Sequence, residues 1–204
     1  MENAKAEMRK AARRTFRTQR RLSADRHQRP GLTAAHILGR TPLPGSRFVN
    51  FFRRPIFAAY KAVGGEIDAS FLCDVLVARG WRQALPVTVS RDAPLVFRLY
   101  KPGDALAPDA AGITAPTADA RQVEPDLIIA PLMAFDRTGG RLGKGGGHYD
   151  RTIERLRAKK KVFVLGLAYA LQEVADVPRQ AHDQRLDAIL TETGYIEVQR
   201  DQDH

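Results

Sequence analysis

A glycine-rich segment that contains two basic residues is the part of the chain whose composition points most directly to chemistry. Six glycines lie between Gly139 and Gly147, with Arg141 and Lys144 among them. Glycine lets the backbone adopt positive φ and approach a ligand closely, so that successive N–H groups can surround phosphate oxygens. The two cations add the positive charge that a polyphosphate requires. The segment therefore predicts a phosphate site; a surface hairpin with solvated basic side chains is the alternative.

Two widespread phosphate-binding motifs do not fit this segment. A Walker A loop needs Gly five residues before its Gly-Lys pair and Ser or Thr directly after it, but Thr138 and Gly145 occupy those positions. The dinucleotide pattern G-x-G-x-x-G, started at Gly143, needs Gly where the chain has His148. Neither of these nucleotide-binding classes is therefore supported.

Strands and helices are predicted to alternate around the glycine-rich segment. Apolar runs predict strands at residues 55–63, 83–88, 95–100, 127–130 and 162–168, with late candidates at 187–191 and 195–199. Helices are predicted at 67–79 and 148–158, and a long connection at 102–119. This order predicts one α/β domain over residues 1–204, with a mostly parallel sheet flanked by helices. Ligands of such sheets bind beyond the carboxyl ends of the strands.

Residues 4–27 predict an amphipathic helix with a basic face, on which Lys5 and Arg9 lie one turn apart. Residues 1–29 hold ten Lys or Arg and three Asp or Glu, a net +7 of the +10 of the whole chain. Such charge attracts anions of any kind, so a nucleic-acid-binding module is one alternative. The aromatic residues of the chain are not interleaved with basic ones as in known RNA-binding motifs. Nucleic acid is therefore not the expected partner.

The remaining composition indicates a protein of the cell interior. No apolar run approaches the length that spans a bilayer, and no apolar leader follows Met1. The single cysteine, Cys73, cannot form an internal disulfide and falls on a predicted buried helix face. We expect a cytoplasmic monomer that does not associate with membranes.

Residues 141–151 resemble the R-L-G-x-G-x-G-Y-Y-D-R signature of the 5-formyltetrahydrofolate cyclo-ligase family. Further resemblances follow in the family's order and span nearly the whole chain. They are K-x-x-x-R at residues 5–9, E-[IV]-[DE] at 66–68, the strand D-L-[IV]-[IL]-x-P within 125–131, and H-D-x-x-x-D at 182–187.

The resemblance implies an ATP-dependent ligase that converts 5-formyltetrahydrofolate into 5,10-methenyltetrahydrofolate, in a NagB/RpiA/CoA-transferase-like fold. The catalytic residues that it implies are Arg141, Lys144 and Tyr149. The implied ATP-binding residues are Lys5, Arg9, Arg141, Leu142, Gly143, Lys144, Gly145, Gly146, Gly147, His148 and Tyr149. The implied folate-binding residues are Lys61, Glu66, Lys144, Gly145, Gly146, Gly147 and His148, and the implied Mg²⁺ ligands are Asp150 and Asp183.

From the residues alone, several of these positions have structural alternatives. Lys5 and Arg9 could belong to a solvated helix face, and Glu66 could cap the helix that follows it. Asp150 could stabilise a helix N-terminus, and Asp183 could be a surface acid.

Two positions depart from the family pattern. His148 stands where the family usually has the first Tyr of a pair, and Ala115-Pro116 stands where bacterial members often have Glu-Pro. A relative with an altered substrate is therefore an alternative. So is a sugar-phosphate or acyl-CoA enzyme of similar architecture, because a fold does not fix chemistry.

Overall fold

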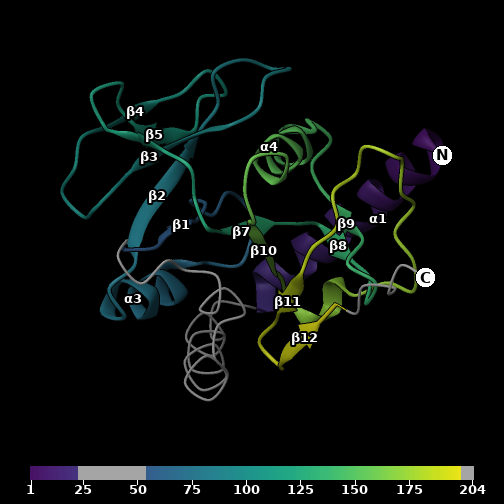
Figure 1. Cartoon of the computed structure of the whole chain (residues 1–204). Helices are drawn as coiled ribbons and strands as arrows, with labels where there is room; N and C mark the ends of the chain where they lie inside the picture. Colours follow the sequence, from purple (N-terminus) through teal and green to yellow (C-terminus); the bar gives the residue numbers. More distant parts are fainter. Residues whose placement is uncertain (23–53, 199–204) are drawn as a thin grey trace.

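The computed structural model describes residues 1–22 and 54–198 (Figure 1). Within them, eight strands form one sheet in the order β12-β11-β10-β7-β1-β2-β3-β6. The strands are β1 Ile56–Ala58, β2 Arg82–Val87, β3 Val96–Leu99, β6 Gln122–Val123, β7 Leu127–Pro131, β10 Phe163–Leu167, β11 Ala188–Leu190 and β12 Tyr195–Glu197. The neighbouring strands β11, β10, β7, β1 and β2 are parallel, whereas β12, β3 and β6 join antiparallel. The predicted mostly parallel α/β sheet is confirmed.

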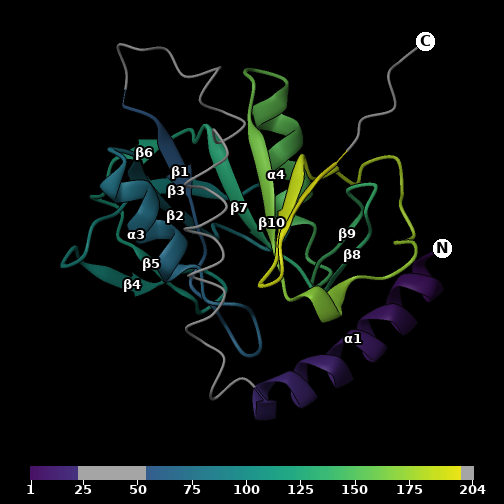
Figure 2. The ribbon, with the colours of Figure 1, turned by 90° about the horizontal axis from the view of Figure 1, so that it is seen from below.

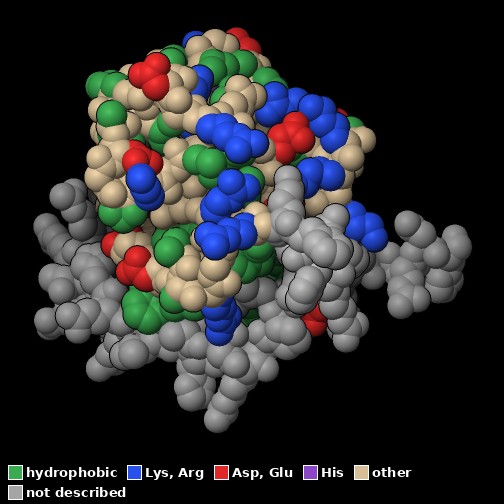
Figure 3. All heavy atoms as spheres, turned by 60° about the vertical axis from the view of Figure 1, so that its left-hand side comes forward, with side chains coloured by type: hydrophobic (Ala, Val, Ile, Leu, Met, Phe, Trp, Pro, Cys, Tyr) green, Lys and Arg blue, Asp and Glu red, His purple; other side chains and the backbone are tan. Residues whose placement is uncertain are grey.

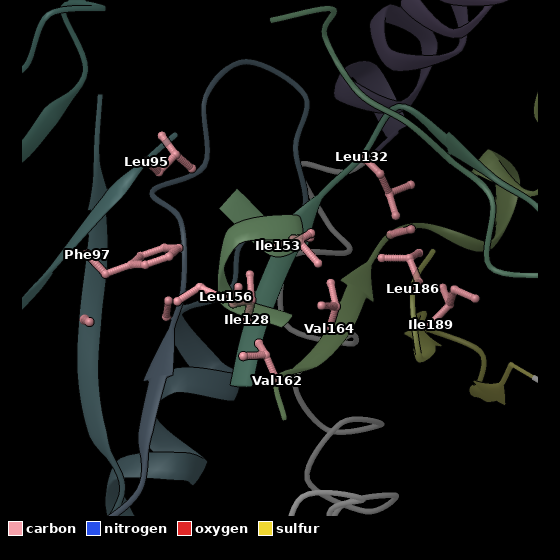
Figure 4. Close-up of a cluster of buried hydrophobic side chains, with 14 of the residues drawn as sticks. Leu95, Phe97, Ile128, Leu132, Ile153, Leu156, Val162, Val164, Leu186 and Ile189 are labelled. Atoms are coloured by element: carbon pink, nitrogen blue, oxygen red, sulfur yellow. The ribbon is translucent and has the colours of Figure 1, made fainter. Parts of the chain in front are cut away.

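Strand β7 shows why the centre of the sheet is buried on both faces. Leu127 and Ile129 belong to a core cluster with Leu72 and Leu76 of helix α3 (Ser70–Ala78). The alternate residue Ile128 belongs to a second cluster, to which helix α4 (His148–Arg157) contributes Ile153 and Leu156. Figure 4 shows this second cluster. Because successive strand side chains point to opposite faces, a continuous apolar strand needs a helix on each side.

The third described helix, α1 (Glu2–Leu22), lies along one end of the sheet beside β8 and β9, as Figure 2 shows. Its Ala12 and Met8 pack with Met133 and Leu142 in a small separate cluster. The predicted helix over 4–27 is confirmed up to Leu22, and residues 23–27 lie outside the described part. The predicted short helix at 33–38 and the basic, aromatic stretch 38–52 also lie outside it. Among the described residues, no helix is long and apolar enough to cross a bilayer.

Helix α3 begins later than its sequence pattern predicts. Asp68 accepts hydrogen bonds from the backbone N–H and the hydroxyl of Ser70, at 2.9 Å each, and this local turn delays the first helical residue. The apolar periodicity of residues 67–79 predicts Phe71 in the core, but this residue is 37% exposed. Cys73 is buried as expected, and burial raises the pKa of its thiol to about 12, so it is not a nucleophile at neutral pH.

Two hairpins lie where the sequence predicts irregular chain. Strands β4 (Leu106–Pro108) and β5 (Thr114–Pro116) pair within the predicted connection 102–119. Strands β8 (Ala134–Phe135) and β9 (Arg141–Leu142) pair directly after β7. Arg141 and Leu142 therefore lie on a strand rather than in a continuous glycine loop. A short 3-10 helix, η2 (Ala170–Gln172), follows β10.

Candidate active site

The glycine-rich segment connects β9 to α4 beyond the carboxyl end of β7. Gly145 and Gly147 have φ of +106° and +63°, in the region that side-chain-bearing residues rarely adopt. Space is also limiting, since a Cβ at Gly146 would lie 2.8 Å from the His148 ring. The backbone at Gly145 and Gly147 therefore favours glycine, which is the arrangement expected of a chain that presents N–H groups to a ligand.

Arg141 lies beside this segment as a buried cation. Its side chain is 3% exposed, and it donates a hydrogen bond of 2.7 Å to Oδ1 of Asp150. Its guanidinium carbon lies 5.5 Å from the centroid of the Tyr149 ring. Burial raises the pKa of Tyr149 well above its ordinary value, against the opposing charge of Arg141, so the hydroxyl stays protonated and can donate a hydrogen bond. The alternative of a solvated arginine is wrong.

Helix α1 brings two cations to the same place. Lys5 is 6% exposed and forms an ion pair with Asp183, and its ammonium lies 3.5 Å from Oε1 of Gln180. One turn later, Nε of Arg9 donates to the carbonyl oxygen of Gly143 at 3.2 Å. The alternative of a solvated face is therefore wrong for this pair.

Three other basic residues of α1 do not share this burial. Lys10, Arg13 and Arg14 are exposed. On the face of the molecule that Figure 3 shows, Lys and Arg side chains gather with a few acidic ones between them. Lys5 and Arg141 are buried and fixed near the glycine-rich segment, which favours a small anionic ligand over a nucleic acid.

The carboxylates of Asp150 and Asp183 come from neighbouring segments. The backbone N–H of Gln184 donates to Asp150 at 3.1 Å, and that of Gln180 donates to Asp183 at 2.6 Å. Burial alone raises the pKa of Asp183, but the hydrogen bonds from Lys5 and Gln180 and the charge of Lys5 hold it below its ordinary value. Asp183 is thus available as an anionic oxygen donor, and Asp150 is the ion-pair partner of Arg141.

These two carboxylates are the Mg²⁺ ligands that the family resemblance implies. The described residues contain no group of three or more His, Cys, Asp or Glu that could hold a metal ion. Mg²⁺ in nucleotide sites usually has one or two carboxylates, with phosphate oxygens and waters completing its octahedron. A pair of acids is therefore the appropriate donor set. Each acid forms an ion pair with a buried cation, Arg141 or Lys5.

A further ion pair links the glycine-rich segment to the loop after β1. Lys144, 58% exposed at its side chain, lies 2.6 Å from Oε1 of Glu66, whose side chain is 8% exposed. The other oxygen of Glu66 accepts a hydrogen bond of 2.9 Å from the backbone N–H of Val63. Because α3 begins only at Ser70, Glu66 does not cap that helix. It faces the same segment as the predicted nucleotide residues.

The profile that describes the 5-formyltetrahydrofolate cyclo-ligase family matches residues 3–192. The chain belongs to this family. It is 37% identical over 139 residues to the 5-formyltetrahydrofolate cyclo-ligase of Escherichia coli K12, an alignment that covers 66% of this chain and 76% of that protein. It is 34% identical to the Mycolicibacterium smegmatis cyclo-ligase, over 65% of this chain and 71% of that one.

Solved structures of the family support the same assignment. The structure of Aquifex aeolicus 5,10-methenyltetrahydrofolate synthetase is similar with a TM-score of 0.71 and 25% identity, covering 98% of this chain and 96% of that one. The Mycoplasma pneumoniae synthetase, 20% identical with a TM-score of 0.64, covers 90% of this chain and 98% of its own and shares the fold. The resemblance seen in the sequence motifs is confirmed, and the protein is a cyclo-ligase enzyme.

Three predicted site residues of this cyclo-ligase lie differently from the rest. Lys61 is placed over the Tyr100 ring, 5.7 Å from its centroid, so it faces the end of β3. The Leu142 side chain is 1% exposed in the cluster with α1, which leaves only its backbone for a ligand. His148 packs against Gly146 and places Nδ1 3.0 Å from the carbonyl oxygen of Ala93. Ligand contacts by these three residues stay predictions.

Sequence motifs do not reveal the residues that hold the cyclo-ligase's ion pairs in place. Gln180 and Gln184 contact Lys5 and Asp150 from the segment before β11. Asp136, in the β8–β9 turn, is 1% exposed and bonds to both the hairpin and that segment. A signal for Asp136 was present, because Asp three residues before Gly139 is a common turn signature. No local signal marks the two glutamines.

Proposed function

We propose that this cyclo-ligase uses ATP to convert 5-formyltetrahydrofolate into 5,10-methenyltetrahydrofolate, with release of ADP and phosphate. The observation that carries the proposal is the buried Arg141 guanidinium beside a segment in which Gly145 and Gly147 have positive φ. That arrangement suits a triphosphate, and the relatives named above are cyclo-ligases and a synthetase of this folate product. The cytoplasmic location and monomeric state expected from the sequence stay predictions.

The reaction requires an amide oxygen to act as a nucleophile. The N5-formyl oxygen attacks the γ-phosphorus of ATP, the bond to the bridging oxygen breaks, and ADP leaves with that electron pair. N10 then adds to the activated formyl carbon and loses its proton, and the C–O bond breaks to release phosphate. The cationic N5–C–N10 bridge of the product remains. Since a formyl oxygen is a weak nucleophile, alignment and charge stabilisation must supply most of the acceleration.

The polyphosphate would lie on the N–H groups of residues 143–147, with Arg141 and Lys5 as cations. Positive groups fixed in a protein interior stabilise developing charge more than solvated ones do, because they need not reorganise. The neutral Tyr149 hydroxyl is a donor for the same oxygens. Mg²⁺ held by Asp150 and Asp183 would offset the negative charge of the phosphate oxygens.

The folate would lie on the Glu66 side of the glycine-rich segment. Glu66 is mostly buried and already accepts one backbone hydrogen bond, so its orientation is fixed. A fixed carboxylate can accept from the amino and ring N–H groups of a pterin. Lys144, which Glu66 holds at 2.6 Å, stands between the two proposed ligands and can bind either the γ-phosphate or the formyl oxygen.

The purified protein, given 5-formyltetrahydrofolate and Mg-ATP, is expected to produce the near-ultraviolet absorbance of the methenyl product. Release of ADP should match product formation one for one. Omission of ATP is the control and should abolish both signals. A protein that binds Mg-ATP but leaves the absorbance unchanged would instead be a relative with another substrate.

Lys144→Ala is expected to lower turnover with Mg-ATP tenfold or more, which corresponds to about 1.4 kcal/mol of transition-state stabilisation. The exposed ammonium contributes little by itself, but its removal leaves Oε1 of the mostly buried Glu66 without its partner at 2.6 Å, so a modest fall in melting temperature is also expected. Lys159→Ala is the control for the loss of an exposed lysine, since Lys159 is 56% exposed and pairs with Glu124, which is itself 43% exposed. Equal rates for Lys144→Ala and Lys159→Ala would remove Lys144 from the mechanism.

A further inference from the structure

One carboxylate outside the proposed ligand contacts is fully enclosed at the turn between β8 and β9. Asp136 is 1% exposed. Its Oδ1 accepts from the backbone N–H of Thr138 at 2.8 Å, from the Thr138 hydroxyl at 2.6 Å and from the backbone N–H of Gly140 at 3.0 Å. Its Oδ2 accepts from the backbone N–H of Val177 at 2.9 Å. One side chain thus collects four hydrogen bonds, none of them from a charged group.

These bonds keep the carboxylate ionised in spite of its burial. Burial alone raises the pKa of Asp136, but the hydrogen bonds from Thr138, Val177 and Gly140 bring it below its ordinary value. An ionised acceptor forms stronger hydrogen bonds than a neutral one. The turn and the Val177 segment are therefore held by charge-assisted bonds rather than by ordinary loop contacts.

The first three bonds fix the backbone directly before Arg141. Gly140 lies so close to Asp136 that a Cβ on it would be 2.2 Å from Oδ2, which no real side chain could occupy. The turn also bonds to itself, because the N–H of Asp136 donates to the Gly140 carbonyl at 3.1 Å. The position from which Arg141 extends toward the glycine-rich segment is set by this carboxylate.

The fourth bond reaches the opposite side of the proposed nucleotide site. Val177 begins the stretch that continues to Gln180, Asp183 and Gln184. Asp183 pairs with Lys5 of α1, and Gln184 donates to Asp150. One carboxyl group therefore connects the strand that carries Arg141 to the segment that holds Lys5.

We propose that Asp136 is a positioning residue for polyphosphate binding, setting the spacing between Arg141 on one side and the Lys5–Asp183 pair on the other. The inference rests on the proposed function, since it assumes that these cations bind ATP. Small displacements at such a site have large effects, because binding and transfer depend on fixed geometry. Nucleotide affinity should therefore respond to Asp136 more than folate affinity does.

Asp136→Asn tests this with little change in shape. The amide keeps one acceptor oxygen, but its NH₂ group must then face either the Val177 N–H or the donors of Thr138 and Gly140. Because two hydrogen-bond donors would then face each other, the hydrogen bonds on one side of the substituted side chain are lost. Asp109→Asn is the matched control, because Asp109 accepts from the backbone N–H groups of Thr88, Ala111 and Ile113 in the β4–β5 turn, at 2.8 to 3.0 Å.

Both substitutions should lower the melting temperature, but only Asp136→Asn should weaken nucleotide binding. By calorimetry, at a temperature at which all the proteins are folded, Asp136→Asn is expected to raise the Kd for Mg-ATP about tenfold. Asp109→Asn should leave that Kd within about twofold of wild type. In steady-state assays, the KM for ATP of Asp136→Asn should rise by a similar factor, while the KM for 5-formyltetrahydrofolate changes less than about twofold.

Thr138→Val provides a second variant should Asp136→Asn not fold, because it removes only the hydroxyl donor to Oδ1. A rise of about two- to threefold in the Kd for Mg-ATP is expected from it. Unchanged nucleotide affinity in the folded variants, or an equal loss in Asp109→Asn, would overturn the positioning role while the proposed function stands. A wild-type protein that binds no Mg-ATP would overturn both.

Discussion

Replacement of Arg141 by alanine is expected to lower kcat/KM at least about 100-fold, or about 2.7 kcal/mol, the usual loss when a fixed transition-state donor is removed. The guanidinium is nearly inaccessible to water and lies between Asp150 and the Tyr149 ring. Its loss removes a cation from the γ-phosphate and leaves the Asp150 carboxylate without its counter-charge. The absorbance of the methenyl product under saturating Mg-ATP measures the effect.

Arg137→Ala is the matched control for this prediction. Arg137 lies in the same hairpin, but its side chain is 69% exposed and pairs with Glu173 at 2.6 Å. An exposed ion pair contributes little, so this variant should keep its activity within about twofold. Arg141→Lys keeps the charge but cannot contact two oxygens in a plane, and an intermediate rate is expected. Similar rates for Arg141→Ala and Arg137→Ala would contradict the assigned role.

The central sheet could be predicted because its signal is local. Residues 127–130 and 162–168 are short apolar runs, and a strand buried on both faces has that composition. The structure forms β7 and β10 there and pairs them in parallel. The short strands were harder to predict. Strands β4, β5, β8 and β9 have two or three residues each, too few for an alternating pattern to be recognised.

The glycine-rich segment could be predicted as a site, but its supporting contacts could not. Its glycines and cations are contiguous, so their chemistry is visible in the sequence alone. The ion pair between Lys5 and Asp183 joins residues 178 positions apart, and the bond between Asp136 and Val177 joins residues 41 apart. Composition and periodicity describe neighbours along the chain. They carry no information on such long-range pairs until the order of the strands in the sheet is known.

The buried side of α3 is only partly predictable from its apolar residues. The apolar residues of 67–79 suit two different helical stripes, one through Phe71 and Val75 and one through Leu72 and Leu76. In the structure the stripe through Leu72 and Leu76 faces the sheet, and Val75 of the other stripe packs partly against the same cluster. A short helix with apolar residues around most of its circumference does not itself indicate which side is buried.

Asp150→Ala is expected to lower turnover with Mg-ATP about 30- to 100-fold, more than Lys144→Ala. The larger effect has two sources. The buried Arg141 guanidinium loses the partner that lies 2.7 Å away, and the proposed Mg²⁺ loses one of two protein oxygens. Turnover measured over a range of Mg²⁺ concentrations at fixed ATP reports the result, and half-saturation should move to higher Mg²⁺.

Asp150→Asn separates the two sources of that loss. The amide oxygen can still accept from Arg141 and from the Gln184 N–H, so the local shape is kept while the negative charge is removed. Without that charge, Arg141 attracts metal-free ATP more strongly, and calorimetry should give tighter binding of ATP in the presence of a chelator than wild type shows. Addition of Mg²⁺ should then improve the affinity of Asp150→Asn less than that of wild type.

The same charge change at an exposed position tests whether Asp150 acts as a metal ligand or only through its long-range electrostatic field. Asp176 lies in the segment before Asp183, where its exposed carboxylate is largely screened by salt. Asp176→Asn should leave both the affinity for metal-free ATP and the Mg²⁺ dependence within about twofold of wild type. An Asp150→Asn variant with the Mg²⁺ dependence of wild type would show that Asp150 serves only to hold Arg141. The proposed metal would then have to rely on Asp183, the other acid of the expected pair, and on the phosphates.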